Sequence, residues 1–169
     1  MADINPSQPQ AGRPHMPGYG IPDASEGQGL LPWQWALERL EPARHYWLST
    51  TRPDGRPHVM PVWGVWVDDR FYFSTGGESR KARNLAGNAQ CVVSVELADG
   101  AVIMEGTAVE AQSESLPQPV FAAYQTKYEW ELDPAMGPIF VVQPRVVFGF
   151  SSVPGQFTGS ATRWRFAGC

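Results

Sequence analysis

The chain has 169 residues and a formal net charge of −4, with 17 Asp and Glu side chains against 13 Lys and Arg side chains. This length suits a single domain with a substantial core, and the acidic balance argues against nucleic acid as a partner. No apolar run reaches the ~18 residues of a membrane-spanning helix, and the N-terminal stretch lacks the pattern of a secretory signal. We therefore expect a cytoplasmic protein that binds no membrane.

Residues 1–29 are rich in Pro, Gly, Gln and Ser and show no periodicity. This composition predicts a flexible N-terminal arm, followed by one domain over residues 30–169. Apolar residues then recur at helical spacing, at Trp33, Ala36, Leu37 and Leu40. Pro32 suits the first turn of this predicted helix, and Pro42 ends it.

Strand patterns dominate from residue 45 onward and alternate with turn residues. Asp54-Gly55 and Asp99-Gly100 each predict a hairpin between two apolar runs. Two further helices are expected, at about residues 79–88 and between residue 113 and about residue 132. Five or six antiparallel strands with a few helices indicate a mainly β protein that forms a closed or partly closed barrel.

The predicted strand over residues 58–67 contains Pro61 and Gly64, which are unusual inside a strand. Proline cannot donate a hydrogen bond to a neighbouring strand, so Pro61 predicts an edge, a bulge or a gap that faces a ligand. Trp63 and Trp66 lie on opposite faces of the same run. One could line a flat pocket or a subunit interface, although core or interface packing of both is the commoner outcome.

Three cations gather directly behind a glycine turn, at Arg80, Lys81 and Arg83. If a helix begins here, Ser79 caps it, and its first-turn amides point towards Gly76-Gly77, where an anion would bind well. Cations oppose the dipole at a helix N-terminus, so a bound anion would offset their cost.

Two interpretations of this cluster stay open. In the first it cradles a phosphate, and three hydroxyls complete the hydrogen bonds, those of Ser74, Thr75 and Ser79. In the second it is a solvated helix start, where Glu78 offsets the positive charge. The spacing matches neither a P-loop nor a Rossmann fingerprint, which disfavours an ATPase and a Rossmann dehydrogenase.

Other motifs for metal binding or catalysis are missing from the sequence. It has no C-x-x-C or H-x-x-x-H pair, no G-x-S-x-G elbow and no paired carboxylates. Cys91 lies in an apolar run and is predicted to be a buried thiol that does not pair with Cys169. We therefore expect no metal and no catalytic side chain, so that a bound cofactor would carry any chemistry.

The C-terminal run TRWRF places Arg163 and Arg165 on one face of a strand and Trp164 on the other. The two arginines could bind a carboxylate or a phosphate, or they could pair with acidic neighbours.

The long run YWLSTTRPDGRPHVMPVWGVWVDDRFYFSTGGESRKARNL, continued by CVVSVE and EGTAVE, resembles the pyridoxamine 5'-phosphate oxidase-like split β-barrel proteins. More narrowly, it resembles their actinobacterial flavin and deazaflavin oxidoreductases. The resemblance covers roughly residues 33–168 and leaves the N-terminal arm unexplained. It implies a homodimer of six-stranded antiparallel split barrels, with a flavin-like cofactor in each of two grooves at the interface.

The resemblance also implies which residues contact the cofactor. The phosphate-binding segment of the family matches at Ser74, Thr75, Ser79, Arg80, Lys81 and Asn84. The strand that passes the ring matches at Met60, Pro61 and Val62. Contacts with the second subunit or with substrate are expected at Trp63, Trp164 and Arg165, although Trp164 and Arg165 only loosely echo the arrangement that pyridoxamine-phosphate oxidases use.

The sequences of the segments PHVMPVWGVW and SRKARNL more closely resemble those of the branch that uses coenzyme F420. This coenzyme is a deazaflavin with a phosphate and a polyglutamate tail. The cluster of cations would suit such an extended anion, and FMN with its single phosphate is the alternative. The implied function is hydride transfer from reduced F420 to a small unsaturated or planar substrate. A module that stores a flavin or haem without turnover, and a dimer that acts only as a scaffold, are the other hypotheses.

Overall fold

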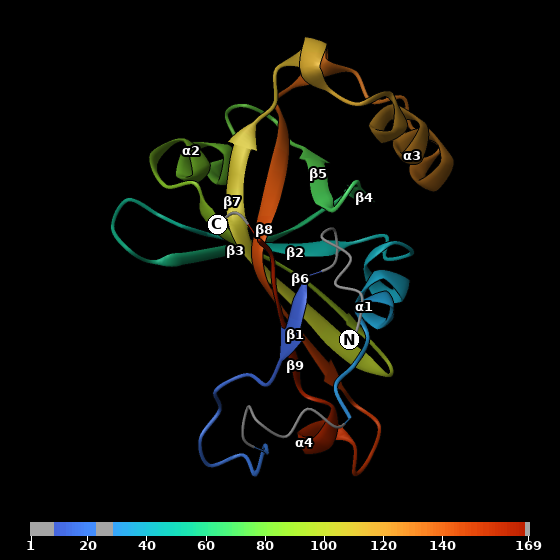
Figure 1. Cartoon of the computed structure of the whole chain (residues 1–169). Helices are drawn as coiled ribbons and strands as arrows, with labels where there is room; N and C mark the ends of the chain where they lie inside the picture. The colour runs from blue at the N-terminus through green and yellow to red at the C-terminus, as the bar shows by residue number, and fades with distance from the viewer. Residues whose placement is uncertain (1–8, 23–28, 168–169) are drawn as a thin grey trace.

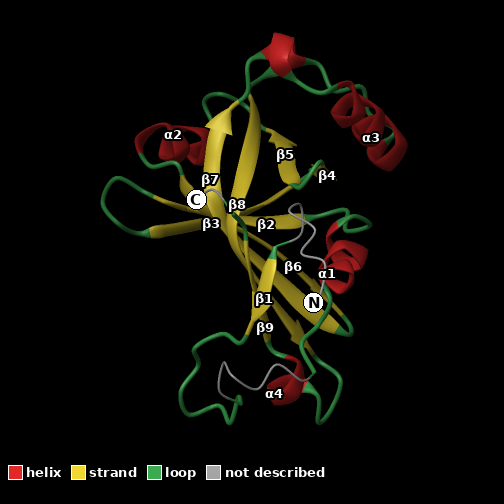
Figure 2. Ribbon diagram, viewed as in Figure 1, coloured by secondary structure: helices red, strands yellow, loops and turns green. Residues whose placement is uncertain are grey.

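The computed structural model describes residues 9–22 and 29–167, and within them it forms a mainly β architecture (Figures 1 and 2). The strands are β1 (Gln10–Gly12), β2 (Tyr46–Thr51), β3 (Pro57–Val62), β4 (Val65–Val67), β5 (Arg70–Ser74), β6 (Gln90–Leu97), β7 (Gly100–Glu110), β8 (Ile139–Ser151) and β9 (Thr162–Arg165). The α-helices are α1 (Trp33–Leu40), α2 (Arg80–Gly87), α3 (Gln118–Tyr128) and α4 (Phe157–Ser160).

All strand pairs are antiparallel, in the order β1-β9-β8-β7-β6-β2-β3. The long strand β8 divides the sheet, because its first residues pair with β5 and its later residues pair with β9. The predicted mainly β, antiparallel fold is confirmed. The described residues form nine strands rather than the expected six, because the sheet recruits short strands such as β1 and because the run 58–67 breaks into two.

The break between β3 and β4 falls at Trp63 and Gly64. Glycine is required here by space, because a Cβ atom on Gly64 would lie 2.2 Å from the Phe71 ring and 2.8 Å from the carbonyl oxygen of Tyr72. Pro61 lies on β3 at the edge of the sheet order, where a strand tolerates a residue that has no N–H. The expectation of an edge at Pro61 is therefore confirmed.

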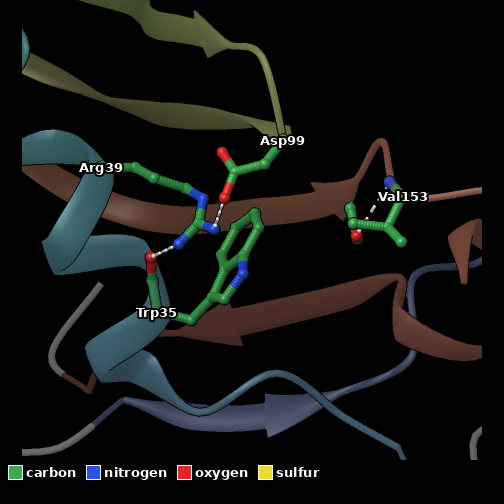
Figure 3. Close-up of polar contacts among 5 residues, drawn as sticks. Trp35, Arg39, Asp99 and Val153 are labelled. Atoms are coloured by element: carbon green, nitrogen blue, oxygen red, sulfur yellow. Dashed lines mark hydrogen bonds and ion pairs between the residues drawn. The ribbon is translucent and has the colours of Figure 1, made fainter.

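Helix α1 matches its predicted pattern and buries Trp33, Ala36 and Leu40 against the barrel. On its outer side, the Arg39 guanidinium forms an ion pair with Asp99 in the β6–β7 turn, and it also donates to the carbonyl oxygen of Trp35 at 2.8 Å (Figure 3). The same guanidinium lies 3.6 Å from the centre of the Trp35 ring. These contacts join α1 to the β6–β7 hairpin.

The core contains Trp164, whose side chain is fully buried and packs edge-on against Trp33 with ring centroids 5.4 Å apart. The prediction that Trp164 contacts a second subunit or a substrate is therefore wrong, because its side chain points into the barrel interior. Arg163 and Arg165 lie on the opposite face of β9, as the alternation predicts. The predicted burial of Cys91 is confirmed, and its lack of pairing with Cys169 stays a prediction, because Cys169 lies outside the described residues.

The expected N-terminal arm is partly wrong, because Gln10–Gly12 adds strand β1 to the sheet by pairing with β9. The next residue, Arg13, is buried and donates to the carbonyl oxygens of Gly159 and Ala161. This pairing depends on the distant C-terminal strand, so local composition could not reveal it. Among the described residues, no helix combines the length and the apolar character needed to cross a membrane.

Candidate functional site

A cavity of about 320 Å³ lies between the ends of β3 and β5, the start of α2, and α3 with the loop that follows it. We call it the α2–α3 cavity, and both helices lie at the same end of the molecule (Figure 1). Its lining residues are Pro61, Val62, Trp63, Ser74, Thr75, Lys81, Tyr124, Trp130 and Leu132. Six of these nine come from the residues predicted from sequence, and the last three do not.

The turn before α2 is held by its own side chains. The Ser79 hydroxyl accepts a hydrogen bond from the Ala82 N–H at 3.3 Å, which confirms the predicted N-cap, and it lies 3.1 Å from the hydroxyl of Thr75. The Ser79 N–H in turn donates to the Gly76 carbonyl oxygen at 2.9 Å. No acidic residue lies in the first turn of α2, so no carboxylate of that turn competes with an anion for the helix dipole.

Positive charge gathers at this end of the cavity from two elements. Lys81 is half-buried and lines the cavity, and burial lowers the pKa of its ammonium group. The pKa of His58 is lowered by burial and then by the charges of Arg52, Lys81 and Arg80, so these three cations are near enough to act on the imidazole. None of the three forms an ion pair with another described residue.

Sequence reasoning missed Arg52 and His58, which lie on the β2–β3 hairpin. The strand register pairs Thr50 with His58, and this hairpin contacts α2. Because the hairpin was predicted, the pairing of residues 50 and 58 could be predicted with it. The contact between the hairpin and α2 could not be predicted, because it depends on the tertiary fold.

Asn84 does not line the α2–α3 cavity. Its side chain is 2% exposed, and its amide donates to the Thr50 hydroxyl at 2.9 Å. The predicted role of Asn84 as a cofactor ligand is therefore wrong in this geometry, because the side chain turns inward and fastens α2 to β2. Arg83 lies on the other side of the helix, in a separate groove that also contains Glu110.

The remaining predicted residues lie around the cavity or away from it. Met60 is 44% exposed on β3 and is not part of the lining, although its neighbours Pro61 and Val62 are. Arg80 is exposed beside Lys81. Arg165 is exposed on β9 and lies outside the lining.

Aromatic side chains form the other end of the cavity. The Trp63 indole stacks on Tyr128 with centroids 4.7 Å apart and an interplanar angle of 6°. Trp130 meets Trp63 edge-on at 6.5 Å, and both indoles remain nearly half exposed. Trp130 lies in the loop after α3, although the sequence pattern predicted helix up to about residue 132, and no sequence motif marks it. The exposed indole surfaces can pack against a planar ring.

Burial raises the pKa of the Tyr124 hydroxyl, so this group stays protonated at neutral pH. It accepts a hydrogen bond from the Ser74 N–H and donates one to the Trp63 carbonyl oxygen, each at 3.2 Å. In the described chain, no three His, Cys, Asp or Glu side chains are placed to hold a metal ion. The cavity thus combines an anion-binding end with a flat aromatic end, an arrangement that fits a phosphorylated cofactor with a planar ring.

Comparison with solved structures gives the same fold. An F420 reductase is 25% identical, with a TM-score of 0.53, and the match covers 75% of this chain and 98% of that one. A haem storage protein from Vibrio cholerae is 19% identical (TM-score 0.54; 67% and 87% covered). A FAD-binding protein from Mesorhizobium loti is 16% identical (TM-score 0.54; 79% and 95% covered).

No curated protein matches the sequence significantly. The family model for pyridoxamine 5'-phosphate oxidase matches residues 35–150, which is more than half of the chain. That span contains every residue of the α2–α3 cavity. The chain therefore belongs to the pyridoxamine 5'-phosphate oxidase family and has its flavin-binding fold.

Proposed function

We propose that this protein is an oxidoreductase that uses coenzyme F420 to transfer a hydride to a small unsaturated or planar substrate. One observation carries the proposal: the α2–α3 cavity is lined by Lys81, which has no ion-pair partner in the described chain, and by the indoles of Trp63 and Trp130, which remain partly exposed. The likeness to an F420 reductase at 25% identity supports the choice of deazaflavin. When bound, the cofactor supplies the hydride chemistry.

The residues of the chain bind and orient the cofactor in this proposal. Lys81, the hydroxyls of Thr75 and Ser79 and the first amides of α2 would hold the phosphate, because charge-assisted hydrogen bonds to a helix N-terminus suit that group. The ring would lie along Pro61 and Val62, near Trp63. Arg52 and Arg80 add positive charge for a longer anionic tail, which favours F420 over FMN.

The second candidate is a module that binds a flavin or haem without turnover. It is favoured by the scarcity of acid-base groups among the lining residues, since Tyr124 is engaged in hydrogen bonds and stays protonated. Mixing reduced F420 with the protein and a panel of planar acceptors separates the two. Oxidation of F420 that needs both protein and acceptor supports the reductase, and tight binding without oxidation across the panel supports the module.

We also propose that the protein is a homodimer. On the outer face of β2 and β3, Trp47 is 50% exposed and Val59 is 52% exposed. A groove of about 330 Å³ continues this face across β6, β7 and β8, and it contains Val92 and Val146. Apolar surface of this kind marks interaction sites. Since Trp47 pairs with Pro61 of the cavity lining, a second copy on this face would border the cofactor.

A further inference from the structure

Two tyrosines one turn apart on α3 hold the break between β3 and β4. The Tyr128 hydroxyl accepts a hydrogen bond from the Gly64 N–H at 2.9 Å, and it donates to the carbonyl oxygen of Gly64 at 2.9 Å or of Arg44 at 3.0 Å. The Tyr124 hydroxyl bridges the Ser74 N–H and the Trp63 carbonyl oxygen. Each hydroxyl therefore joins two backbone segments that the sheet leaves apart.

These bonds replace the ladder pairing that the break removes. The pairing of β3 with β2 ends at Val62, and the pairing of β4 with β5 begins at Val65. Gly64 is buried, and buried backbone groups need hydrogen-bond partners. Lys127, between the two tyrosines, adds a third bond, because its ammonium group donates to the Gly64 carbonyl oxygen at 3.1 Å. One turn of α3 thus satisfies the backbone of the break.

The position of the break determines where Trp63 lies. Its indole stacks on Tyr128 and lines the α2–α3 cavity, so one tyrosine holds both the backbone and the ring of this segment. Ser74, which also lines the cavity, is tied to the same helix by Tyr124. Rotation of Trp63 or its separation from Ser74 would change the space for a planar ring.

We propose that Tyr124 and Tyr128 are positioning residues, whose hydroxyls fix the distance between Trp63 and Ser74 and so set the width of the ring-binding end of the cavity. The link to a cofactor ring rests on the proposed function. We call the hydrogen bonds of the Tyr124 and Tyr128 hydroxyls to the backbone the tyrosine clamp. The tyrosine clamp is a property of the ligand-free chain and is tested without cofactor.

The first test is amide hydrogen exchange, resolved by residue, on Tyr124→Phe and Tyr128→Phe. Each change keeps the ring and removes the hydroxyl, so the fold is retained. Tyr128→Phe should speed exchange at Gly64 on the order of tenfold and leave Ser74 unchanged, and Tyr124→Phe should do the reverse. Each variant is the control for the other. Equal changes at both amides, or none, would overturn the clamp.

The second test separates the ring end from the anion end. Tyr128→Phe should weaken F420 binding several-fold and leave the affinity for inorganic pyrophosphate unchanged. Tyr72→Phe is the matched control, since Tyr72 is buried near α3 and its hydroxyl forms no hydrogen bond with another described residue. If Tyr124→Phe and Tyr128→Phe both bind F420 as the wild type does, the positioning role is wrong. If the wild type binds neither F420 nor FMN, the proposed function fails, while the exchange test still decides the clamp.

Discussion

Neighbouring residues on α2 have separate tasks because a helix turns its side chains to different sides. Lys81 lines the α2–α3 cavity, Arg83 lines another groove, and Asn84 turns into the protein to meet Thr50. The motif that contains all three could be recognised from the sequence. The direction of each side chain could not, because it depends on how α2 sits against β2.

Replacing Lys81 with alanine should weaken the binding of a phosphorylated cofactor. A charge-assisted hydrogen bond contributes about 1.5–3 kcal/mol, which corresponds to roughly 10- to 150-fold in affinity. Arg83→Ala is the matched control, because it removes a cation from the same helix outside the cavity. Isothermal titration with F420 and FMN measures both variants, and equal losses for the two would exclude a specific role for Lys81.

At the scale of elements, α3 carries a half-buried cation, Lys127, whose hydrogen-bond partners are neutral. The Lys127 ammonium donates to the Tyr46 hydroxyl at 2.7 Å and lies over the rings of Tyr46 and Tyr128. Burial, with a smaller effect of the nearby Arg44, lowers the pKa of Lys127 to about 8. Its charged form therefore opposes folding at neutral pH.

The folded state binds fewer protons at Lys127 than the unfolded chain does, because the pKa is lower when folded. The free energy of unfolding should therefore rise as pH increases from about 8 towards 10.5, the ordinary pKa of a lysine side chain. Above about pH 10 the buried tyrosines, with raised pKa values, reverse this trend. Urea unfolding at about pH 7.5 and about pH 9.5 measures the rise, and a similar rise in Lys127→Met would assign it to other groups.

The break between β3 and β4 makes a second prediction at this scale. Gly64→Ala should lower the free energy of unfolding by at least the ~1–3 kcal/mol typical of overpacking, because the added Cβ atom meets the Phe71 ring and a backbone oxygen. Gly76→Ala is the control, since apart from its chain neighbours no described residue has an atom within 4 Å of its Cβ position. Chemical denaturation compares the two, and equal stability would contradict the packing at the break.

Elements defined by local patterns were predictable from the sequence. The helices α1 and α2 and the turn before β7 follow from apolar spacing, a serine cap and turn residues. Strand β1 and the hydrogen bond that joins Thr50 to Asn84 of α2 were not predictable, since they join segments far apart in the chain. Three of the nine residues that line the cavity share this property, because Tyr124, Trp130 and Leu132 come from α3 and the loop that follows it.

At the scale of the whole molecule, the exposed face of β2 and β3 predicts self-association. Trp47→Asp should convert the proposed homodimer to a monomer, because a charge buried in an apolar interface without a partner is costly. Val109→Asp is the control, since Val109 is exposed in the groove beside α2 instead. Light scattering coupled to gel filtration gives the mass of each variant, and a monomeric wild type would contradict the proposed homodimer.

The most direct test of the central claim is a titration of the wild-type protein with F420 and with FMN, followed by tryptophan emission. Trp63 and Trp130 border the α2–α3 cavity, so a ring bound there should quench them. We predict saturable quenching by F420 in the micromolar range or tighter, with weaker binding of FMN. Absence of binding by both cofactors in that range would contradict the assignment of the cavity.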